Sequence, residues 1–187
     1  GKADPLALAG TVPAYAIPNL AVDHVPVGID LPVARMRGGG DALSAFFIEC
    51  FIDEIAERLG REKLSYRIAM LGQDLRMVEV LQRAARLAEW DGGEVASGQG
   101  LACHRMTLGE RSGRIACIAQ ASPGEGGVRV TRLSAAVDIG RIVNRDLARQ
   151  QIEGGLIYGM SLALGSAMGF AKGFPDKNRL AALDLPK

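Results

Sequence analysis

The sequence contains few of the side chains that commonly hold a metal ion without a cofactor. Its 187 residues include only three cysteines and two histidines. Cys50, Cys103 and Cys117 lack Cys-x-x-Cys spacing and each lies in an apolar run, so we interpret them as reduced residues of the core. His24 and His104 are far apart and have no companion at ligand spacing. The sequence therefore predicts no metal site built from side chains, and a metal would have to enter the protein within a cofactor.

The chain also lacks an excess of charge of either sign. Its 22 Lys and Arg nearly balance its 21 Asp and Glu, which gives a formal net charge of +1 at pH 7. Such a chain has no strong field that attracts nucleic acid or an anionic membrane. Arg141, Arg145 and Arg149 recur at fourfold spacing, which is more typical of a solvated helix face than of a phosphate track. We therefore predict no nucleic-acid partner.

A signal peptide and a convincing membrane-spanning run are absent as well. No charged and then apolar segment opens the chain, and glycines interrupt the apolar stretch near residues 154–168. Because the chain begins with Gly1 and not with Met, we expect its start to be internal or derived from a tag. The missing signal therefore says little about the compartment of the parent protein.

The order of the predicted elements indicates an α+β fold, with antiparallel strands packed against helices. Asp41 is expected to cap a helix over 42–59, and Asp74 to cap a helix over 75–89. Strand patterns follow at 99–107, 113–121 and 128–138, and a third capping residue, Asn144, predicts a helix over 144–165. The apolar face of the first helix is formed by Ala45, Phe46, Ile48, Ile52, Ile55 and Leu59.

Arg37-Gly-Gly-Gly40, directly before the first predicted helix, is a candidate anion site. Free backbone N–H groups, the positive end of the helix dipole and one guanidinium would all favour an anion. The Lys-Ser/Thr of a phosphate loop and the spaced glycines of a dinucleotide fingerprint are both missing, so a plain flexible loop is the alternative.

Gln151-Ile-Glu-Gly-Gly155, within the last predicted helix, is the second candidate segment. Each Gly in a helix interior costs about 1 kcal/mol relative to Ala, so Gly154, Gly155 and Gly159 together give up about 2–3 kcal/mol. Glycines permit the close approach of another backbone or of a bulky ligand. Gln151 can both donate and accept a hydrogen bond to such a ligand. The alternative interpretation is tight helix packing beside solvated polar side chains.

These segments resemble the molybdopterin-binding subunits of the xanthine dehydrogenase and aldehyde oxidase family. Gln151-Ile-Glu-Gly-Gly155, preceded by Val137-Asp-Ile-Gly-Arg-Ile-Val-Asn144, is similar to the family's Gln-x-Glu-Gly motif and its lead-in strand. Further similar passages, in the family's order, are Ala14-Tyr-Ala-Ile-Pro18, Phe46-Phe-Ile-Glu-Cys-Phe-Ile-Asp-Glu54 and Gly98-Gln-Gly-Leu-Ala-Cys-His104. The resemblance covers nearly the whole chain and is nearest to the large, or beta, subunit of isoquinoline 1-oxidoreductase-like enzymes.

The resemblance implies part of a molybdenum hydroxylase, which oxidises an N-heterocycle or an aldehyde with oxygen derived from water. It implies a molybdopterin cofactor with molybdenum, in the cytosine dinucleotide form, and electron transfer to 2Fe-2S clusters on an iron–sulfur small subunit. The other partners would be the remainder of the large subunit and the small-molecule substrate. The implied cofactor contacts in this chain are Arg37, Gly38, Gly39, Gly40, Gln151, Glu153, Gly154 and Gly155.

The resemblance also implies that the chain is a fragment without a catalytic residue of its own. The family's catalytic glutamate lies farther toward the C-terminus than Lys187, and the upstream half of the cofactor cradle would precede Gly1. Residues 1–65 would end a first cofactor-binding subdomain, and residues 66–187 would form part of the second, with a boundary near 60–72. Family members occur in the bacterial cytoplasm and, when exported, in the periplasm, so the compartment stays open.

Two other functions compete with the cofactor hypothesis. One is a non-catalytic α+β scaffold that contributes only packing or subunit contacts, and the other is a phosphate-ligand module that uses Arg37. Glu153 separates the cofactor hypothesis from the scaffold hypothesis. Beside a cofactor it should be buried and paired, for example with Arg141, whereas in a scaffold it should be exposed. Glu49 and Asp53, one helical turn apart, could form a metal-binding pair, but the resemblance favours the outer face of a structural helix.

Overall fold

A computed structural model of the chain describes residues 4–28, 34, 36–108, 110–125, 127–177 and 179–182. The contacts divide the chain into two compact units. Unit 1 contains the residues up to 123 together with 129–140, and unit 2 contains 124–128 and the residues from 141 onward. The fold is α+β with an antiparallel strand pair, as predicted. The boundary between two cofactor-binding subdomains near 60–72 stays a prediction.

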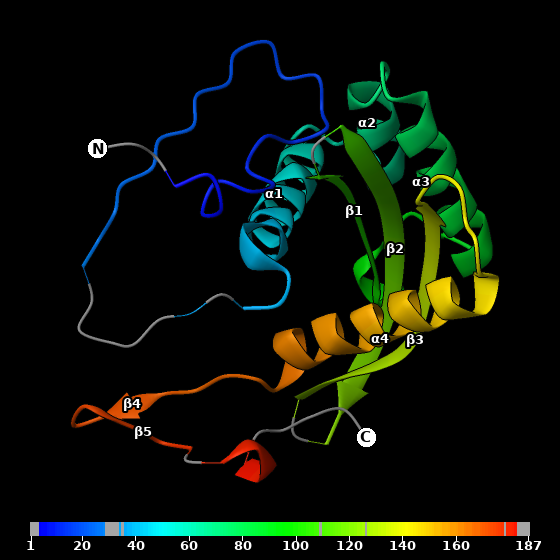
Figure 1. The fold of residues 1–187 in the computed structure, drawn as a ribbon. Helices are drawn as coiled ribbons and strands as arrows, with labels where there is room; N and C mark the ends of the chain where they lie inside the picture. Colours follow the sequence, from blue (N-terminus) through cyan, green and yellow to red (C-terminus); the bar gives the residue numbers. More distant parts are fainter. Residues whose placement is uncertain are drawn as a thin grey trace. The chain divides into compact units, whose positions relative to one another are not determined.

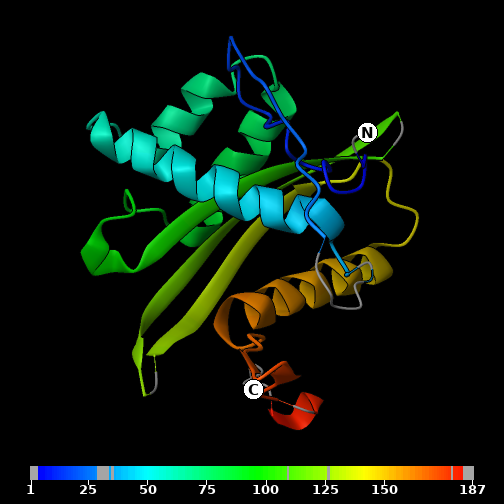
Figure 2. The ribbon, with the colours of Figure 1, turned by 90° about the vertical axis from the view of Figure 1, so that its left-hand side faces the viewer.

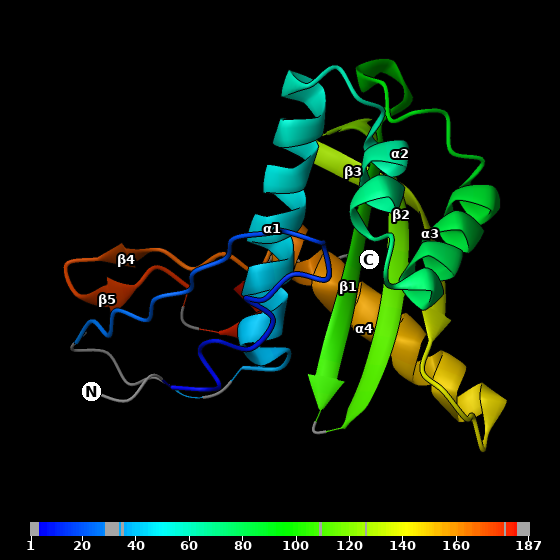
Figure 3. The ribbon, with the colours of Figure 1, turned by 90° about the horizontal axis from the view of Figure 1, so that it is seen from above.

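Unit 1 consists of three helices on one face of a three-stranded sheet (Figures 1 and 3). The helices are α1 (Gly39–Arg58), α2 (Lys63–Met70) and α3 (Leu75–Ala88). Both α1 and α3 contact strand β1, and α2 contacts each of the other two helices. The chain therefore closes one side of the sheet with helices that follow each other in sequence.

The sheet of unit 1 is a meander of consecutive strands. After the short 3-10 helix η1 (Val95–Ser97), the strands β1 (Gln99–Leu108), β2 (Arg111–Gly124) and β3 (Gly127–Asp138) lie in the order β1-β2-β3. Antiparallel pairing places Cys103 of β1 opposite Ala116 of β2. Alternate residues of the two strands therefore face the helices and enter the core.

The core lies between this sheet face and the helices. The sheet contributes Leu101, Cys103, Ala116 and Ile118, and α3 contributes Met77, Val80, Leu81, Ala84, Ala85 and Ala88, all of them buried. The 14 residues of α3 repeat apolar side chains every three or four positions, which is the pattern of a helix with one buried face. Asp74 caps α3, as predicted, by accepting a hydrogen bond of 3.1 Å from the Met77 N–H.

Two sequence-based predictions for the helices of unit 1 were wrong. Helix α1 begins at Gly39, and its N-cap is Gly38, whereas Asp41 lies in the first turn. Helix α2 was not predicted, because the segment was interpreted as a boundary. The Glu62 side chain caps α2 by accepting hydrogen bonds from the Leu64 and Ser65 N–H groups at 2.8 and 2.7 Å.

The N-terminal segment, which precedes α1, has no helix or strand in its described residues, but it lies against α1 and α2 and is part of the packing of unit 1. It passes close to the first turns of α1 (Figure 2). The Ser44 hydroxyl donates to the Ala9 carbonyl at 3.0 Å, and the Ala16 N–H donates to the Met70 carbonyl at 2.8 Å. These contacts hold Tyr15, which is buried, in position beneath the helices.

Unit 2 is built around helix α4 (Arg145–Leu164), which matches the helix predicted over 144–165. The Asn144 side chain caps it by accepting a hydrogen bond of 3.0 Å from the Leu147 N–H. A small antiparallel pair, β4 (Phe170–Ala171) and β5 (Phe174–Pro175), and the 3-10 helix η2 (Leu180–Ala182) follow. Within the described parts of the chain, none of the helices is long and apolar enough to span a membrane.

Candidate functional site

The segment Arg37–Gly40 forms the start of α1 and requires its glycines for two different reasons. Gly38 and Gly39 have φ angles of 91° and 52°, in the left-handed region that glycine adopts without strain. Gly40 has no room for a side chain, because a Cβ would lie 2.7 Å from the Leu6 carbonyl oxygen. The three glycines therefore shape the turn and admit the N-terminal segment against the helix.

The N-terminus of α1 carries no side-chain cap among the described residues. Asp41, the predicted cap, instead forms a hydrogen bond with His104 of β1, with 2.9 Å between Asp41 Oδ1 and His104 Nε2. A Cβ at Gly10 would lie 2.9 Å from that same Asp41 oxygen, so the N-terminal segment packs closely over the pair. His104 is thus a half-buried structural residue that joins β1 to α1, as expected for a packed strand histidine.

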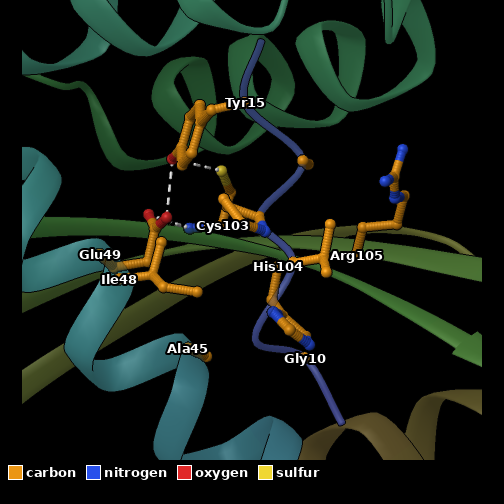
Figure 4. Close-up of a pocket in the computed structure, with 11 residues that line it drawn as sticks. Gly10, Tyr15, Ala45, Ile48, Glu49, Cys103, His104 and Arg105 are labelled. Carbon is orange, nitrogen blue, oxygen red and sulfur yellow. Dashed lines mark hydrogen bonds between the residues drawn. The ribbon is translucent and has the colours of Figure 1, made fainter. Parts of the chain in front are cut away.

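A buried polar cluster, formed by Tyr15, Glu49, Arg67 and Cys103, lies at the centre of unit 1. The Glu49 carboxylate accepts three hydrogen bonds: from the Tyr15 hydroxyl at 2.7 Å, from the Cys103 N–H at 2.8 Å and from Arg67 Nε at 3.1 Å. Figure 4 shows Glu49 of α1 directed toward Tyr15 and Cys103. One carboxylate therefore joins the N-terminal segment, α1, α2 and β1.

Arg67 completes the buried polar cluster, and each of its three guanidinium nitrogens donates a hydrogen bond. Its side chain is 0% exposed, and it donates to the Glu49 carbonyl at 3.1 Å and to the Lys63 carbonyl at 3.3 Å. Asp53, one turn after Glu49, lies 2.6 Å from Arg67 as a second carboxylate partner. The pairing of this guanidinium with two carboxylates balances the cost of removing it from water.

The prediction that Glu49 and Asp53 lie on the outer face of α1 was wrong. Glu49 is buried, whereas Phe46 and Leu59, which were predicted to face the core, are 63% and 60% exposed. The prediction of an apolar face was right for Ile52, which is buried, and for Ile48, which packs against the core, so hydrophobicity alone misplaces only part of the inward face, where an ion pair and small side chains also lie.

The surroundings fix the protonation states of the buried polar cluster. Burial, followed by the charges of Cys103 and Glu49, raises the pKa of Tyr15 far above its usual value. Burial works to lower the pKa of Arg67, but the charges of Glu49, Tyr15 and Asp53 together outweigh it, and this pKa is raised. Burial and the Glu49 charge raise the pKa of Cys103 to about 12. A protonated tyrosine, a charged arginine and an un-ionised thiol make this a structural cluster without a reactive nucleophile.

The cavity beside the buried polar cluster is too small for an organic ligand. It has a volume of about 10 Å³ and lies between the N-terminal segment, α1 and β1, with Gly10, Ala45 and His104 among its lining residues (Figure 4). Such a volume corresponds to about one water molecule. The prediction that Cys103 is a core residue is confirmed, whereas Cys50, for which the same was predicted, is exposed.

A second polar cluster joins α3 to the ends of the strands. Asp74 accepts from Arg114 Nε at 2.8 Å and lies 3.3 Å from Arg105, and Asp138 pairs with Arg76 through two hydrogen bonds of 2.6 and 2.7 Å. The hydrogen bonds from Arg76 lower the pKa of Asp138 to about 2. Burial works to raise the pKa of Asp74, but Arg114 and the helix N–H outweigh it, so this pKa is lowered.

The second candidate segment, Gln151–Gly155, lies on a helix that buries none of its described side chains. A Cβ added at Gly154, Gly155 or Gly159 would meet no atom within 4 Å. Gln151 is exposed. The glycines of α4 are therefore not explained by packing within the described residues of unit 2, and the alternative of tight packing inside this unit is not what the structure shows.

Glu153 does not have the surroundings that the cofactor hypothesis predicted for it in this chain. Its side chain is 53% exposed, and it pairs with Arg149 one turn earlier, at 2.6 Å, and not with Arg141. This is an ordinary i, i+4 ion pair of a solvated helix, worth a few tenths of a kcal/mol. The site residues of the two segments otherwise stay predictions, and no group of three or more His, Cys, Asp or Glu among the described residues could hold a metal.

Comparisons with known proteins define the class of this chain. The profile of the family described as "Molybdopterin cofactor-binding domain" matches residues 111–187. This range includes β2, β3 and α4, and thus the segment Gln151–Gly155, but not Arg37–Gly40. The second part of the chain is therefore part of a molybdopterin cofactor-binding domain.

Three curated relatives indicate which enzymes and enzyme subunits this chain resembles. The chain is 29% identical over 174 residues to the beta subunit of isoquinoline 1-oxidoreductase from Brevundimonas diminuta, covering 92% of this chain and 22% of that protein. It is 29% identical over 176 residues to a subunit of nicotinate dehydrogenase from Pseudomonas putida, covering 83% and 15%. It is 27% identical over 165 residues to the membrane-bound, pyrroloquinoline-quinone aldehyde dehydrogenase of Gluconacetobacter polyoxogenes, covering 76% and 21%.

The chain is thus similar to molybdopterin-binding subunits such as the beta subunit of isoquinoline 1-oxidoreductase, and the resemblance predicted from its motifs is confirmed. It spans between 15% and 22% of the length of these relatives.

Proposed function

We propose that this chain is a segment of the large subunit of a molybdenum hydroxylase that oxidises an N-heterocycle or an aldehyde. The observation that carries the proposal is the match of residues 111–187 to a molybdopterin cofactor-binding domain. Isoquinoline 1-oxidoreductase, nicotinate dehydrogenase and aldehyde dehydrogenase are the names of the relatives, and the first two names denote single subunits of larger enzymes. We further propose an iron–sulfur small subunit as the electron-accepting partner.

The start of α1 suits an anionic part of the cofactor. Arg37, Gly38 and Gly39 are exposed, so the backbone at the very start of the helix is accessible, whereas Gly40 is covered by the N-terminal segment. Because no described side chain caps this helix, its N–H groups and the positive end of its dipole can favour a phosphate or another anion. In this role Arg37 supplies the charge, and Gly38, Gly39 and Gly40 supply the backbone shape.

The glycine face of α4 suits the close approach of a flat, bulky group. Because Gly154 and Gly155 have no side chains, the helix backbone is open there, and no atom lies within 4 Å of the position that a Cβ would take at either residue. Gln151 lies one turn earlier and offers both a donor and an acceptor. These residues fit a bound pterin, which they would orient without taking part in bond making.

The bound cofactor, molybdopterin in its proposed cytosine dinucleotide form, would supply the redox chemistry through its molybdenum. This chain would contribute orientation and charge. Glu49 is not a candidate base, because its carboxylate already accepts hydrogen bonds from Tyr15, Cys103 and Arg67. We therefore propose that the catalytic glutamate lies in a part of the large subunit outside these 187 residues.

A non-catalytic scaffold is the second candidate function, and Glu153 favours it. The exposed ion pair of Glu153 with Arg149 is the arrangement that a helix without a cofactor would show. A scaffold predicts no molybdenum in the folded enzyme complex, whereas the cofactor hypothesis predicts about one molybdenum per large chain. Elemental analysis of the full-length gene product, copurified with its small subunit, therefore separates the two functions.

Substitutions test the two candidate segments independently. Gly155→Leu is expected to reduce the molybdenum content of the full-length protein, since the added side chain occupies the open face, whereas Ala163→Leu on the same helix serves as the control. Full molybdenum content in Gly155→Leu would refute the assignment of this face. Arg37→Ala is expected to weaken cofactor retention, and loss of binding of free nucleotide instead would favour a phosphate-ligand module.

A further inference from the structure

The first half of α1 presents an uninterrupted apolar stripe on its outer face. The stripe consists of Leu43, Phe46, Phe47, Cys50 and Phe51, which recur at the spacing of one helix face. Leu43 and the three phenylalanines are between 61% and 65% exposed, and Cys50 is exposed as well. The rings of Phe46 and Phe47 lie edge to face with their centroids 5.5 Å apart. These side chains form one continuous surface.

The apolar stripe ends at a defined position along the helix. Glu54, Glu57 and Arg58 continue the same exposed face and are charged. Between Leu43 and Phe51 the one charged side chain is Glu49, which points inward to the buried polar cluster. The charges of α1 are therefore arranged so that the outer face is free of charge over its first turns only.

Exposure of this stripe is costly for a protein that remains in water. Burial of one phenylalanine side chain contributes about 1.5–3 kcal/mol. Phenylalanine is among the residues most often buried, yet all five phenylalanines of this chain are between 56% and 74% exposed. The largest contiguous apolar patch on a monomeric protein is about 300–600 Å² and is often functional. The stripe therefore has the properties of an interface.

We propose that the apolar stripe of α1 is covered by a segment of the same polypeptide that lies outside these 187 residues. The inference rests on the proposed function, since it requires a large subunit in which this chain is one part. The relatives support it, because the chain covers at most 22% of their length, so in each of them this region is part of a much longer polypeptide.

The size of the stripe favours the same polypeptide over a second copy. Leu43 and the three phenylalanines, each roughly 60% exposed, offer with Cys50 about 500 Å² of surface, given that an aromatic side chain buries about 150–250 Å². A stable dimer buries about 800 Å² on each partner. A contact within one polypeptide needs less area, because chain connectivity removes most of the entropy cost of association.

The composition of the stripe favours the same polypeptide over the small subunit. Interfaces between separately folded subunits commonly carry a polar rim and about one hydrogen bond per 100–200 Å². The stripe itself offers no hydrogen-bonding side chain apart from the Cys50 thiol, and charged residues border it at one end only. The charged turn with Glu54, Glu57 and Arg58 would form the edge of the covered region.

Photocrosslinking in the full-length enzyme complex tests the proposal. Benzoylphenylalanine is placed at Phe47, irradiated in the native complex, and the linked peptide is identified by mass spectrometry. The expected product is a crosslink to the large subunit itself, outside residues 1–187, in a species of unchanged monomer mass. The matched control carries the same probe at Glu57, in the charged part of the exposed face, and is expected to give no defined crosslink.

Several results would overturn the proposal: a link to the small subunit, a link between two large subunits, no link at Phe47, or equal links at both positions. Alkylation of Cys50 gives a second readout without substitution, since this thiol is expected to react at least tenfold more slowly in the native complex than in urea. Equal rates would likewise overturn the proposal. Molybdenum content, measured on the same sample, reports separately on the proposed function.

Discussion

Substitution of Glu49 by Gln is the most direct test of how unit 1 is held together. The change keeps the size of the side chain and removes one charge from the buried polar cluster. Arg67, whose side chain is 0% exposed, then keeps only Asp53 as a charged partner, at 2.6 Å. The new side-chain amide also carries an NH2 group, which cannot accept the hydrogen bonds that the carboxylate oxygen in its place had accepted. The variant therefore leaves a buried charge incompletely compensated.

The expected loss is about 3 kcal/mol of unfolding free energy. Removal of one partner of a buried ion pair typically costs 3–5 kcal/mol, and we take the lower limit because Asp53, which is 25% exposed, remains beside Arg67. With a slope of about 2 kcal/mol per molar urea, the midpoint shifts by about 1.5 M. For a chain of this size the melting temperature is expected to fall by about 6–12 °C.

Urea unfolding followed by tryptophan fluorescence is the appropriate assay. The single tryptophan, Trp90, packs against the core of unit 1 and donates to Glu62 at 2.8 Å. Its fluorescence therefore reports on unit 1 and not on α4. This matters because a chain with two compact units need not unfold in one transition.

Two variants separate the charge from other effects of the substitution. Glu57→Gln removes the same charge from the exposed side of α1 and is expected to change stability by less than about 0.5 kcal/mol. Tyr15→Phe removes only the hydroxyl that donates to Glu49 at 2.7 Å, and is expected to cost about 1.5–3 kcal/mol. If Glu49→Gln costs less than about 1 kcal/mol, the buried polar cluster does not hold unit 1 together and our reasoning is wrong.

Three further predictions concern other parts of the molecule. Gly154→Ala should stabilise this chain by up to about 1 kcal/mol in urea unfolding followed by circular dichroism, because the added Cβ meets nothing within 4 Å; a destabilised variant would show that the face is already packed. Asp138→Asn should lower stability near neutral pH but progressively less as the pH falls from about 4 toward 2. The reason is that Arg76 holds the folded pKa of Asp138 at about 2, and equal effects at about pH 6 and about pH 3 would contradict this. Cys103 should react with maleimide far more slowly than the exposed Cys50, as measured by mass spectrometry of the native chain. The reason is that burial first, and then Glu49, raises the pKa of Cys103 to about 12. Comparable rates would show that the buried polar cluster opens readily.

Elements with a strong local signal could be predicted from the sequence. Helix α3 has a cap at Asp74 and a regular apolar period, and both are intrinsic to a short window of residues. The strands were likewise found from their own local sequence patterns, and Asn144 caps α4 as its position predicted. These elements need no information from distant parts of the chain, which is why their type and approximate bounds were found.

The candidate segments were also found from local sequence, but their surroundings were not. Arg37–Gly40 and Gln151–Gly155 were identified by glycine content and by family resemblance. The structure shows that Gly40 is required by the close approach of Leu6, a contact across 34 positions that no local pattern contains. It also shows Glu153 paired with Arg149, although Arg141 had an equally suitable charge.

The sequence by itself determined the family resemblance, the α+β class and the helices whose caps and periodicity lie within one window. Only the tertiary structure decided which face of α1 is buried, because Glu49 meets Arg67, 18 positions away, and Tyr15, 34 positions away. It likewise decided where α1 begins, because Asp41 bonds to His104, 63 positions later, and is not available as a cap. Local hydrophobicity favours phenylalanine inside, but a buried carboxylate with three donors needs a fixed position, and that requirement sets the orientation of the helix.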